Sequence, residues 1–204
     1  YECRHGIGYS RFTSSKNGVK ASVLSFVPLN DNCEISQLTL TNGSSEDKKL
    51  SVFSYVEWCL WNADDDMKNF QRNLSTGEVE VQDSTIYHKT EYRERRNHYA
   101  IYSVNTKIDG FDTSRDASLG AYRGADSPEA VENGKCTNSM ASGWSPIASH
   151  QINVDLAAGE TKTFIFVLGY IENPEDEKWE SYGVINKTRA KEMLAIYQIG
   201  RAHV

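Results

Sequence analysis

Short runs of alternating apolar and polar residues, separated by turn-forming residues, recur along most of the chain. Residues 35–41 (ISQLTLT) are one such run, and Asn42-Gly43-Ser44-Ser45 closes it. Alternation with a period of two puts the apolar side chains on one face of a strand, and turn signals at short intervals are typical of antiparallel sheets. Asn17-Gly18 is the dipeptide that favours a two-residue hairpin turn. The pattern therefore predicts an all-β, mainly antiparallel protein.

The same criteria predict strands on both sides of a less regular middle region. The first predicted strand starts with Ile7, Tyr9 and Arg11 and leads to the turn at Asn17-Gly18; the others are 19–26, 35–41, 50–60, 78–81, 85–91, 99–105, 151–156 and 161–170. Run 50–60 is apolar on both faces, so we expect a central strand that is covered on each side. Residues 109–149 are rich in Gly, Ser, Asp and Asn, with one helical turn expected at Ser127–Glu132, capped by Ser127 with Pro128 in first position.

The C-terminal part has helical periodicity. Asn186 is expected to cap a helix over 187–198, because Ala190, Met193, Leu194 and Tyr197 share one face at that spacing. We expect a two-sheet β-sandwich with this helix at its C-terminal edge.

The domain boundaries follow from these elements. Residues 1–185 are expected to form the sandwich, and 186–198 the start of a linker helix that leads out of it. Residues 199–204 (IGRAHV) are those that a sequencing-adapter sequence would encode, so we expect a non-native tail there. Since Tyr1 is not a natural start, the chain is expected to be a gene fragment truncated at both ends.

Composition and charge argue against several function classes. The 204 residues carry a formal net charge of −6, which disfavours nucleic-acid binding, and the basic run Arg93–Arg96 has acidic neighbours. No apolar run approaches the roughly 20 residues of a membrane span. Four cysteines form no CxxC pair, and no signal peptide is present, which together favour a cytoplasmic protein. The cysteines are Cys3, Cys33, Cys59 and Cys136.

One long connection, Trp61–Asn73, concentrates amide, guanidinium and aromatic groups between two predicted strands. Long irregular connections on a rigid scaffold often carry binding groups. Arg72 offers five donors in a rigid fork, and Gln71 offers a donor and an acceptor, which together suit the hydroxyls of a sugar or a phosphate. A purely structural role, in which both side chains tie down their own loop, fits the composition equally well. The candidate binding residues are Asn69, Phe70, Gln71, Arg72 and Asn73.

Other candidate sites are weaker. Asp64–Asp66 suggest the acid pair of a glycosidase, but consecutive side chains point in different directions and nothing apolar adjoins them to raise a pKa. The five histidines lack ligand spacing, so no metal site is expected. No nucleophile elbow or phosphate-binding glycine loop is present. Trp61 and Trp144, each at the entry to a loop, remain candidates for stacking on a sugar ring.

Six longer runs resemble one known family. They are YECRHGIGYSRF, SYVEWCLWNADDDMKNFQRNLSTGEVEV, IYHKTEYRERRNHYA, DGFDTSRDASLGAYRG, SGWSPIASH and VLGYIENPEDEKW. Together they are similar to the N-terminal domain of the cellobiose phosphorylases, which are inverting disaccharide phosphorylases. The resemblance covers the chain from Tyr1 to about Tyr197.

The resemblance implies a fold and a reaction. The full enzyme would add a helical linker, an (α/α) barrel and a small β domain to this β-sandwich (supersandwich), and it would form a cytoplasmic homodimer. It would cleave cellobiose with phosphate to α-glucose 1-phosphate and glucose. Phosphate is an anionic co-substrate, so a single general acid suffices and no other cofactor is needed. In the family that acid is an aspartate of the barrel, so no catalytic residue is expected in this fragment.

The resemblance also gives the loop a role. In the family, the matching segment reaches the acceptor-sugar site of the partner subunit, so Gln71 and Arg72 are expected to contact the acceptor glucose in trans, supported by Asn69, Phe70 and Asn73. Related chains can carry Tyr at the position of Phe70. Three alternatives stay open: a phosphorylase acting on cellodextrin, laminaribiose or chitobiose, a stand-alone carbohydrate-binding sandwich, and a purely structural domain.

Overall fold

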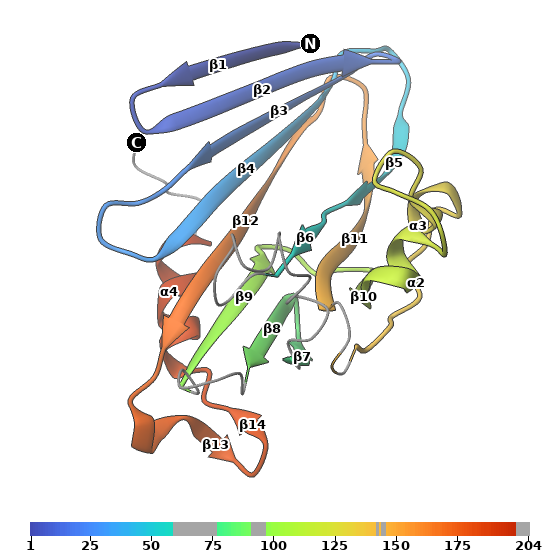
Figure 1. Cartoon of the computed structure of the whole chain (residues 1–204). Coiled ribbons are helices and arrows are strands. Elements are labelled where there is room, and N and C mark those ends of the chain that lie inside the picture. Colours follow the sequence, from blue (N-terminus) through green and yellow to red (C-terminus); the bar gives the residue numbers. More distant parts are fainter. Residues whose placement is uncertain (59–76, 91–96, 142, 144–145, 199–204) are drawn as a thin grey trace.

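The computed structural model describes residues 1–58, 77–90, 97–141, 143 and 146–198, and most of the described strands form two packed sheets (Figure 1). The large sheet has eight strands in the order β1-β2-β3-β4-β12-β9-β8-β7, all paired antiparallel. This confirms the predicted all-β, mainly antiparallel class. Its strands are β1 (Glu2–Gly6), β2 (Tyr9–Lys16), β3 (Val19–Phe26), β4 (Cys33–Asn42), β12 (Thr161–Glu172), β9 (His98–Val104), β8 (Thr85–Thr90) and β7 (Gly77–Gln82).

The small sheet has the order β10-β11-β5, and β6 also pairs with β11. Its strands are β10 (Gly110–Ser114), β11 (Pro146–Leu156), β5 (Lys48–Phe53) and β6 (Val56–Glu57). The expected central strand over 50–60 is wrong in its described part, because β5 lies at an edge of this sheet and ends at Phe53. Leu50 and Val52 pack against the core between the sheets, whereas Lys49 and Ser51 are exposed. The apolar run is thus divided between β5, β6 and the buried Trp58, and is not one strand covered on both faces.

Two apolar clusters cover the two faces of the large sheet. Between the sheets, Tyr102, Phe164 and Phe166 of the large sheet meet Ile152 and Val154 of β11. On the other face, the second cluster joins residues of β4, β8, β9 and β12 to a helix, α4 (Thr188–Tyr197). The strands β8 and β9 are therefore buried on both sides, and every residue of β9 is buried.

Helix α4 confirms the helix predicted at the C-terminal end. Ala190, Met193 and Leu194 are buried against the sheet, and Tyr197 packs beside them. The N-cap residue of the helix is Lys187, which makes no side-chain cap, so the predicted cap Asn186 lies one position further out. Its side-chain oxygen accepts a hydrogen bond from the amide of Thr188 at 3.0 Å.

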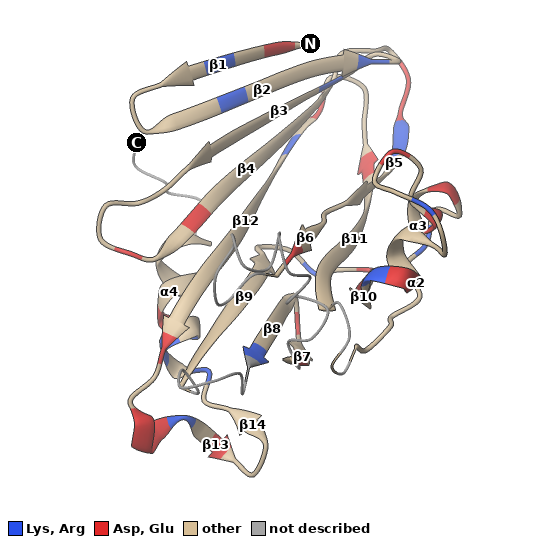
Figure 2. Cartoon of the chain, in the orientation of Figure 1, with Lys and Arg blue, Asp and Glu red and all other residues tan. Residues whose placement is uncertain are grey.

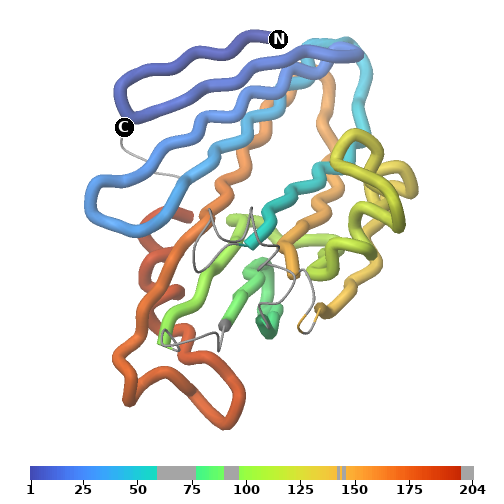
Figure 3. The backbone as a smooth tube through the Cα atoms, in the orientation of Figure 1, coloured from blue at the N-terminus to red at the C-terminus, as the bar shows by residue number. Residues whose placement is uncertain are grey.

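The hairpin between β2 and β3 confirms the Asn-Gly turn. Asn17 and Gly18 have φ angles of 52° and 80°, and Lys16 pairs with Val19 across the turn. A further turn, with Gly8 at a φ of 84°, separates β1 from β2 within the first predicted strand, in which Ile7, Tyr9 and Arg11 were expected to lead on to the Asn17-Gly18 turn. In Figure 3 the strands β1–β3 run along one edge of the molecule, and β1 is exposed along its whole length.

Asn42 joins two of the connections by which the chain passes between the sheets. Its side-chain nitrogen lies 2.8 Å from the carbonyl of Glu46 and 3.1 Å from those of Leu156 and Ala157. Its side-chain oxygen accepts hydrogen bonds from the amide and the hydroxyl of Ser44. The side chain is fully buried, so one amide fixes the β4–β5 and β11–β12 connections together.

The middle region is more ordered than its composition suggested. It contains β10 and two short helices, α2 (Arg115–Leu119) and α3 (Glu129–Glu132). The helical turn expected at Ser127–Glu132 is present, but Ser127 donates to the carboxylate of Glu132 at 2.5 Å and makes no side-chain cap. After β12 come a 3₁₀ turn, η2 (Glu175–Glu177), and a hairpin of β13 (Trp179–Ser181) and β14 (Val184–Ile185), where acidic residues gather (Figure 2).

Candidate functional site

The predicted sugar-binding residues Asn69, Phe70, Gln71, Arg72 and Asn73 lie outside the described residues, and so do Asp64–Asp66, Trp61 and Trp144. The structure does describe the residues at which the segment 59–76 leaves and re-enters the sandwich. Trp58 precedes it, directly after β6, and Gly77 follows it as the first residue of β7. The site is therefore built from these two end residues and the side chains that hold them.

Trp58 is held by a ring contact. Its side chain is buried, and its indole stacks on the imidazole of His88 in β8, with 5.4 Å between ring centroids and 10° between ring planes. Val79 and Ala100 belong to the same buried cluster. The residue before the predicted binding segment is thus fixed by an aromatic contact within the inter-sheet core.

Gly77 is held by the edge of the same imidazole. A Cβ atom at Gly77 would lie 2.0 Å from Cε1 of His88 and 2.9 Å from each ring nitrogen, closer than any side chain could approach. The backbone oxygen of Gly77 also accepts a hydrogen bond from the amide of Gly143 at 2.8 Å. A glycine is needed at the start of β7 because the histidine ring lies directly over its backbone.

Burial keeps His88 neutral. Desolvation, with a smaller contribution from the nearby His98, lowers the pKa of His88 to about 4. Neither Nδ1 of His88 nor Nε1 of Trp58 has a hydrogen-bond partner within the described part of the chain. Burial also lowers the pKa of His150 on β11 to about 3. At neutral pH these rings act as packing groups, and none is poised to transfer a proton.

On its opposite face, the β7–β8 hairpin is fixed by an ion network. The carboxylate of Glu80 in β7 lies 2.9 Å from Nζ of Lys89 and 2.5 Å from Nζ of Lys187. It also accepts a hydrogen bond from the amide of Ile185 in β14. Partial burial alone would raise the pKa of Glu80, but hydrogen bonds from Lys187 and Lys89 outweigh this effect and lower it. The hairpin that borders the predicted binding segment is therefore anchored to β14 and to the residue before α4.

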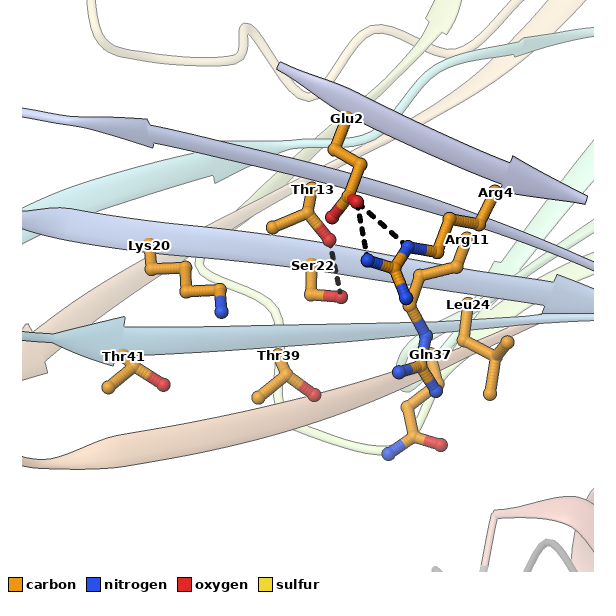
Figure 4. A pocket seen from close by; sticks show the side chains of 10 residues that line it. All are labelled: Glu2, Arg4, Arg11, Thr13, Lys20, Ser22, Leu24, Gln37, Thr39 and Thr41. Atoms are coloured by element: carbon orange, nitrogen blue, oxygen red, sulfur yellow. Dashed lines mark hydrogen bonds and ion pairs between the residues drawn. The ribbon is translucent and has the colours of Figure 1, made fainter.

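A second candidate is a groove of about 480 Å³ on the exposed face of β1–β4, shown in Figure 4. One row of hydroxyl side chains crosses three strands at Thr13, Ser22 and Thr39. The hydroxyl oxygens of Thr13 and Ser22 are 3.4 Å apart. Its carboxylate, Glu2, accepts hydrogen bonds from Arg4. The groove offers hydroxyl, amide and guanidinium groups to a ligand. The lining residues are Glu2, Arg4, Arg11, Thr13, Lys20, Ser22, Leu24, Gln37, Thr39 and Thr41.

Among the described residues, the fully buried carboxylate belongs to Asp112 of β10. It accepts hydrogen bonds from the amides and hydroxyls of Thr137 and Ser139, at 2.6 to 3.2 Å. Since these four donors satisfy its oxygens, Asp112 holds the loop beside β10 and offers no free acid for catalysis.

Two further findings concern metals and membranes, and both apply to the described residues alone. No group of three or more His, Cys, Asp or Glu side chains is arranged to hold a metal ion there. None of the described helices combines the length and the apolar character needed to cross a membrane.

The sequence interpretation missed both Gly77 and His88. A glycine that follows a long connection and opens an alternating strand, and a histidine two residues after the buried Ile86, were the available signals. They could not be joined without knowing that β7 and β8 pair with Val79 opposite His88.

The fold and its anchored connections define an antiparallel β-sandwich domain with a helix on the outer face of its larger sheet. Residues 1–198 match the family described as "Glycosyl hydrolase 94, supersandwich domain", so the chain belongs to that family. It is 31% identical over 170 residues to an N,N'-diacetylchitobiose phosphorylase from Vibrio proteolyticus, covering 83% of this chain and 21% of that protein. It is 28% identical over 182 residues to a solabiose phosphorylase from Paenibacillus borealis, covering 86% of this chain and 23% of that protein. The chain thus spans about a fifth of the length of these curated relatives.

Proposed function

We propose that this chain is the N-terminal domain of a cytoplasmic inverting disaccharide phosphorylase, and that its segment 59–76 contributes Gln71 and Arg72 to the acceptor-sugar site. The observation that supports this most strongly is the family match over residues 1–198, together with relatives named as disaccharide phosphorylases. The anchoring of Trp58 and Gly77 adds support, because a binding segment needs fixed ends on a rigid scaffold.

The proposed reaction is the cleavage of cellobiose by phosphate, with inversion at the anomeric carbon. Phosphate attacks from the face opposite the leaving glucose, and one carboxylic acid protonates the leaving oxygen. Asp112 cannot supply that acid because its oxygens are saturated by donors of its own loop. The proposal places the acid in an (α/α) barrel outside this chain, and it pairs the acceptor segment with the barrel of the second subunit of a homodimer.

Within this site, Arg72 and Gln71 have distinct roles. The guanidinium fork donates to two neighbouring hydroxyl oxygens of the acceptor glucose, and the amide of Gln71 donates to one hydroxyl and accepts from another. Asn69, Phe70 and Asn73 support these two side chains. A sugar held at these points has its leaving oxygen fixed relative to the acid, which lowers the entropic barrier of the reaction.

The test is Arg72→Ala in the full-length enzyme. With glucose and α-glucose 1-phosphate as substrates, we expect kcat/KM for glucose to fall by about 10- to 100-fold, the loss of one or two charge-assisted hydrogen bonds. The matched control is Arg123→Ala, because Arg123 pairs with Glu132 of α3 on the exposed surface. An unchanged KM for glucose in Arg72→Ala removes the site assignment.

Substrate identity needs a separate comparison. Cellobiose, N,N'-diacetylchitobiose, laminaribiose and a short cellodextrin are each supplied with phosphate, and the release of the sugar 1-phosphate is measured. The proposal predicts the highest kcat/KM for cellobiose. A higher value for another disaccharide would keep the reaction class and reassign the substrate.

The groove on β1–β4 favours a second candidate, a stand-alone carbohydrate-binding module, because its side chains can hydrogen-bond to sugar hydroxyls. Calorimetry of the 204-residue chain with cellobiose and cello-oligosaccharides separates the two candidates. A stand-alone module binds these sugars by itself, whereas a domain that completes another subunit's site releases almost no heat.

A further inference from the structure

The groove on the exposed face of β1–β4 has an excess of positive charge. Three cationic side chains, Arg4, Arg11 and Lys20, line it together with one carboxylate, Glu2. This contrasts with the whole chain, whose formal net charge is −6. Because a groove lined mainly by one sign of charge concentrates ions of the opposite sign, the groove is suited to an anionic ligand.

Two of these cations face each other across a strand pair. Arg4 of β1 is directly opposite Arg11 of β2 in the antiparallel ladder, and like charges at such positions repel. Glu2 neutralises Arg4, since its carboxylate lies 2.8 Å from Nε and 2.7 Å from Nη2 of that side chain. The guanidinium of Arg11 makes no ion pair or side-chain hydrogen bond within the described part of the chain. A bound anion would therefore relieve the repulsion and supply the partner that Arg11 lacks.

An amide donor lies in the same row as the two arginines. Arg11, Leu24 and Gln37 are in register across β2, β3 and β4. Figure 4 shows the side chain of Arg11 extending across the sheet toward Gln37. A guanidinium fork matches two oxygens of a phosphate, and the amide nitrogen of a glutamine can donate to a third. This end of the groove therefore has the donors that a phosphate group needs.

A row of hydroxyl groups lies beside the arginines. Thr13, Ser22 and Thr39 each stand two residues along their strands from the row of Arg11, a separation of about 7 Å. The row continues to Thr163 of β12, whose hydroxyl oxygen is 3.4 Å from that of Thr39. Hydroxyl groups both donate and accept hydrogen bonds, as the hydroxyls of a sugar do. The groove thus places groups suited to a sugar next to groups suited to a phosphate.

We propose that Arg4, Arg11 and Gln37 bind a phosphate group, and that the neighbouring row of hydroxyls holds a sugar to which this phosphate is attached. The ligand class is a sugar phosphate, and no residue of the segment 59–76 takes part in the site. The phosphate contact rests on the charge and the strand register of the groove alone. The choice of α-glucose 1-phosphate as a probe rests on the proposed function, because this ester is the product of the proposed reaction.

The experiment is calorimetry of the 204-residue chain at low salt with inorganic phosphate, α-glucose 1-phosphate and glucose. The sugar phosphate is expected to bind most tightly and glucose most weakly. Arg11→Ala should raise the Kd of both phosphate ligands by about 10-fold, through the loss of charge-assisted hydrogen bonds, and Arg11→Lys should give an intermediate Kd. The matched control is Lys49→Ala, which removes one positive charge from an exposed position of β5 and should leave both values unchanged.

Two further measurements separate binding from a structural role of the arginines. Glu2→Gln removes the carboxylate that competes for Arg4, so it should lower the Kd for phosphate by about 3-fold, and a higher Kd would contradict the proposal. Without phosphate, Arg11→Ala should be no less stable than the parent chain in thermal unfolding, because its pairing with Arg4 is repulsive. Added phosphate should raise the Tm of the parent chain more than that of Arg11→Ala.

The proposal is overturned if neither phosphate ligand binds, or if Arg11→Ala and Lys49→Ala have equal effects. Glucose or cellobiose bound as tightly as α-glucose 1-phosphate would overturn the phosphate assignment and favour a site for neutral sugars. Equal affinity for inorganic phosphate and the ester would overturn the sugar part and leave a site for free phosphate. Arg72→Ala keeps the two proposals apart: if it abolishes phosphate binding and Arg11→Ala does not, the groove proposal fails, whereas the acceptor site is judged by the KM for glucose alone.

Discussion

Acidification should destabilise this domain because His88 must take up a proton that its buried site disfavours. The imidazole has a pKa of about 4 in the folded chain, below the ordinary value of 6.5. Between these values the unfolded chain binds the proton and the folded chain does not, so stability is present above pH 6.5 and is lost as the pH falls toward 4. A pKa difference of this size corresponds to roughly 3 kcal/mol of stability.

His150 acts in the same direction. Its pKa of about 3 extends the loss to lower pH, so the two buried rings together require about two protons on unfolding. Where both unfolded-state sites are protonated, the free energy of unfolding should change by up to about 2.7 kcal/mol per pH unit. This slope is the measurable signature of two neutral histidines in the sandwich core.

The assay is urea unfolding followed by tryptophan fluorescence at pH 7, 6, 5 and 4.5. His88→Phe removes one titrating group while keeping a ring against Trp58, so the slope between pH 6 and 4.5 should fall by about 1 kcal/mol per pH unit. Carboxylate titrations elsewhere are common to both proteins and cancel in the comparison. An identical slope for the parent chain and His88→Phe would refute the argument that His88 is neutral in the folded state.

Two other perturbations test the packing that holds the site. Asn42→Ala removes the buried amide that bonds to the carbonyls of Glu46 and Leu156, and should cost roughly 2–4 kcal/mol in chemical denaturation; a loss below about 0.5 kcal/mol would show that water replaces the amide. Glu80→Gln leaves the buried Lys187 without its carboxylate and should cost roughly 3–5 kcal/mol. Adding Lys187→Met to Glu80→Gln should recover part of that loss, and a further loss in the double variant would contradict the ion-network account.

Much of the fold could be predicted from local patterns. The turn at Asn17-Gly18 requires positive φ angles that few other dipeptides accept, and the spacing of Ala190, Met193 and Leu194 fits one face of a helix. Such features depend on residues close in sequence. For this reason the antiparallel class, the β2–β3 hairpin and α4 were predicted correctly.

Features that depend on distant pairing could not be predicted. The sequence 50–60 is apolar enough for a central strand, yet β5 lies at an edge of the small sheet, where β11 is its one partner among the described strands. The strand β10 was hidden in a polar region because Asp112 is buried by donors from Thr137 and Ser139, which lie about 25 residues later in the chain. Composition alone does not reveal that hydrogen-bond donors from a distant part of the chain compensate for the burial of a carboxylate.

The candidate site also has a part that could be predicted from the sequence and a part that could not. The groups suited to sugar, Gln71 and Arg72, could be named from chemistry and from the family resemblance, and they remain a prediction because they lie outside the described residues. The contacts of His88 with Trp58 and Gly77 could not be named, since they arise from a strand register and a ring stack.

The most direct test of the central claim is complementation between two full-length variants, each with reduced activity. One carries Arg72→Ala in this domain, and the other lacks the catalytic acid expected in the barrel. If the acceptor segment acts on the partner subunit, subunit exchange creates mixed dimers in which one site carries both defects and the other is intact. Activity should then rise to about a quarter of that of the parent enzyme in a random mixture. Activity that stays at the average of the two separate variants would contradict a segment that completes the site of another subunit.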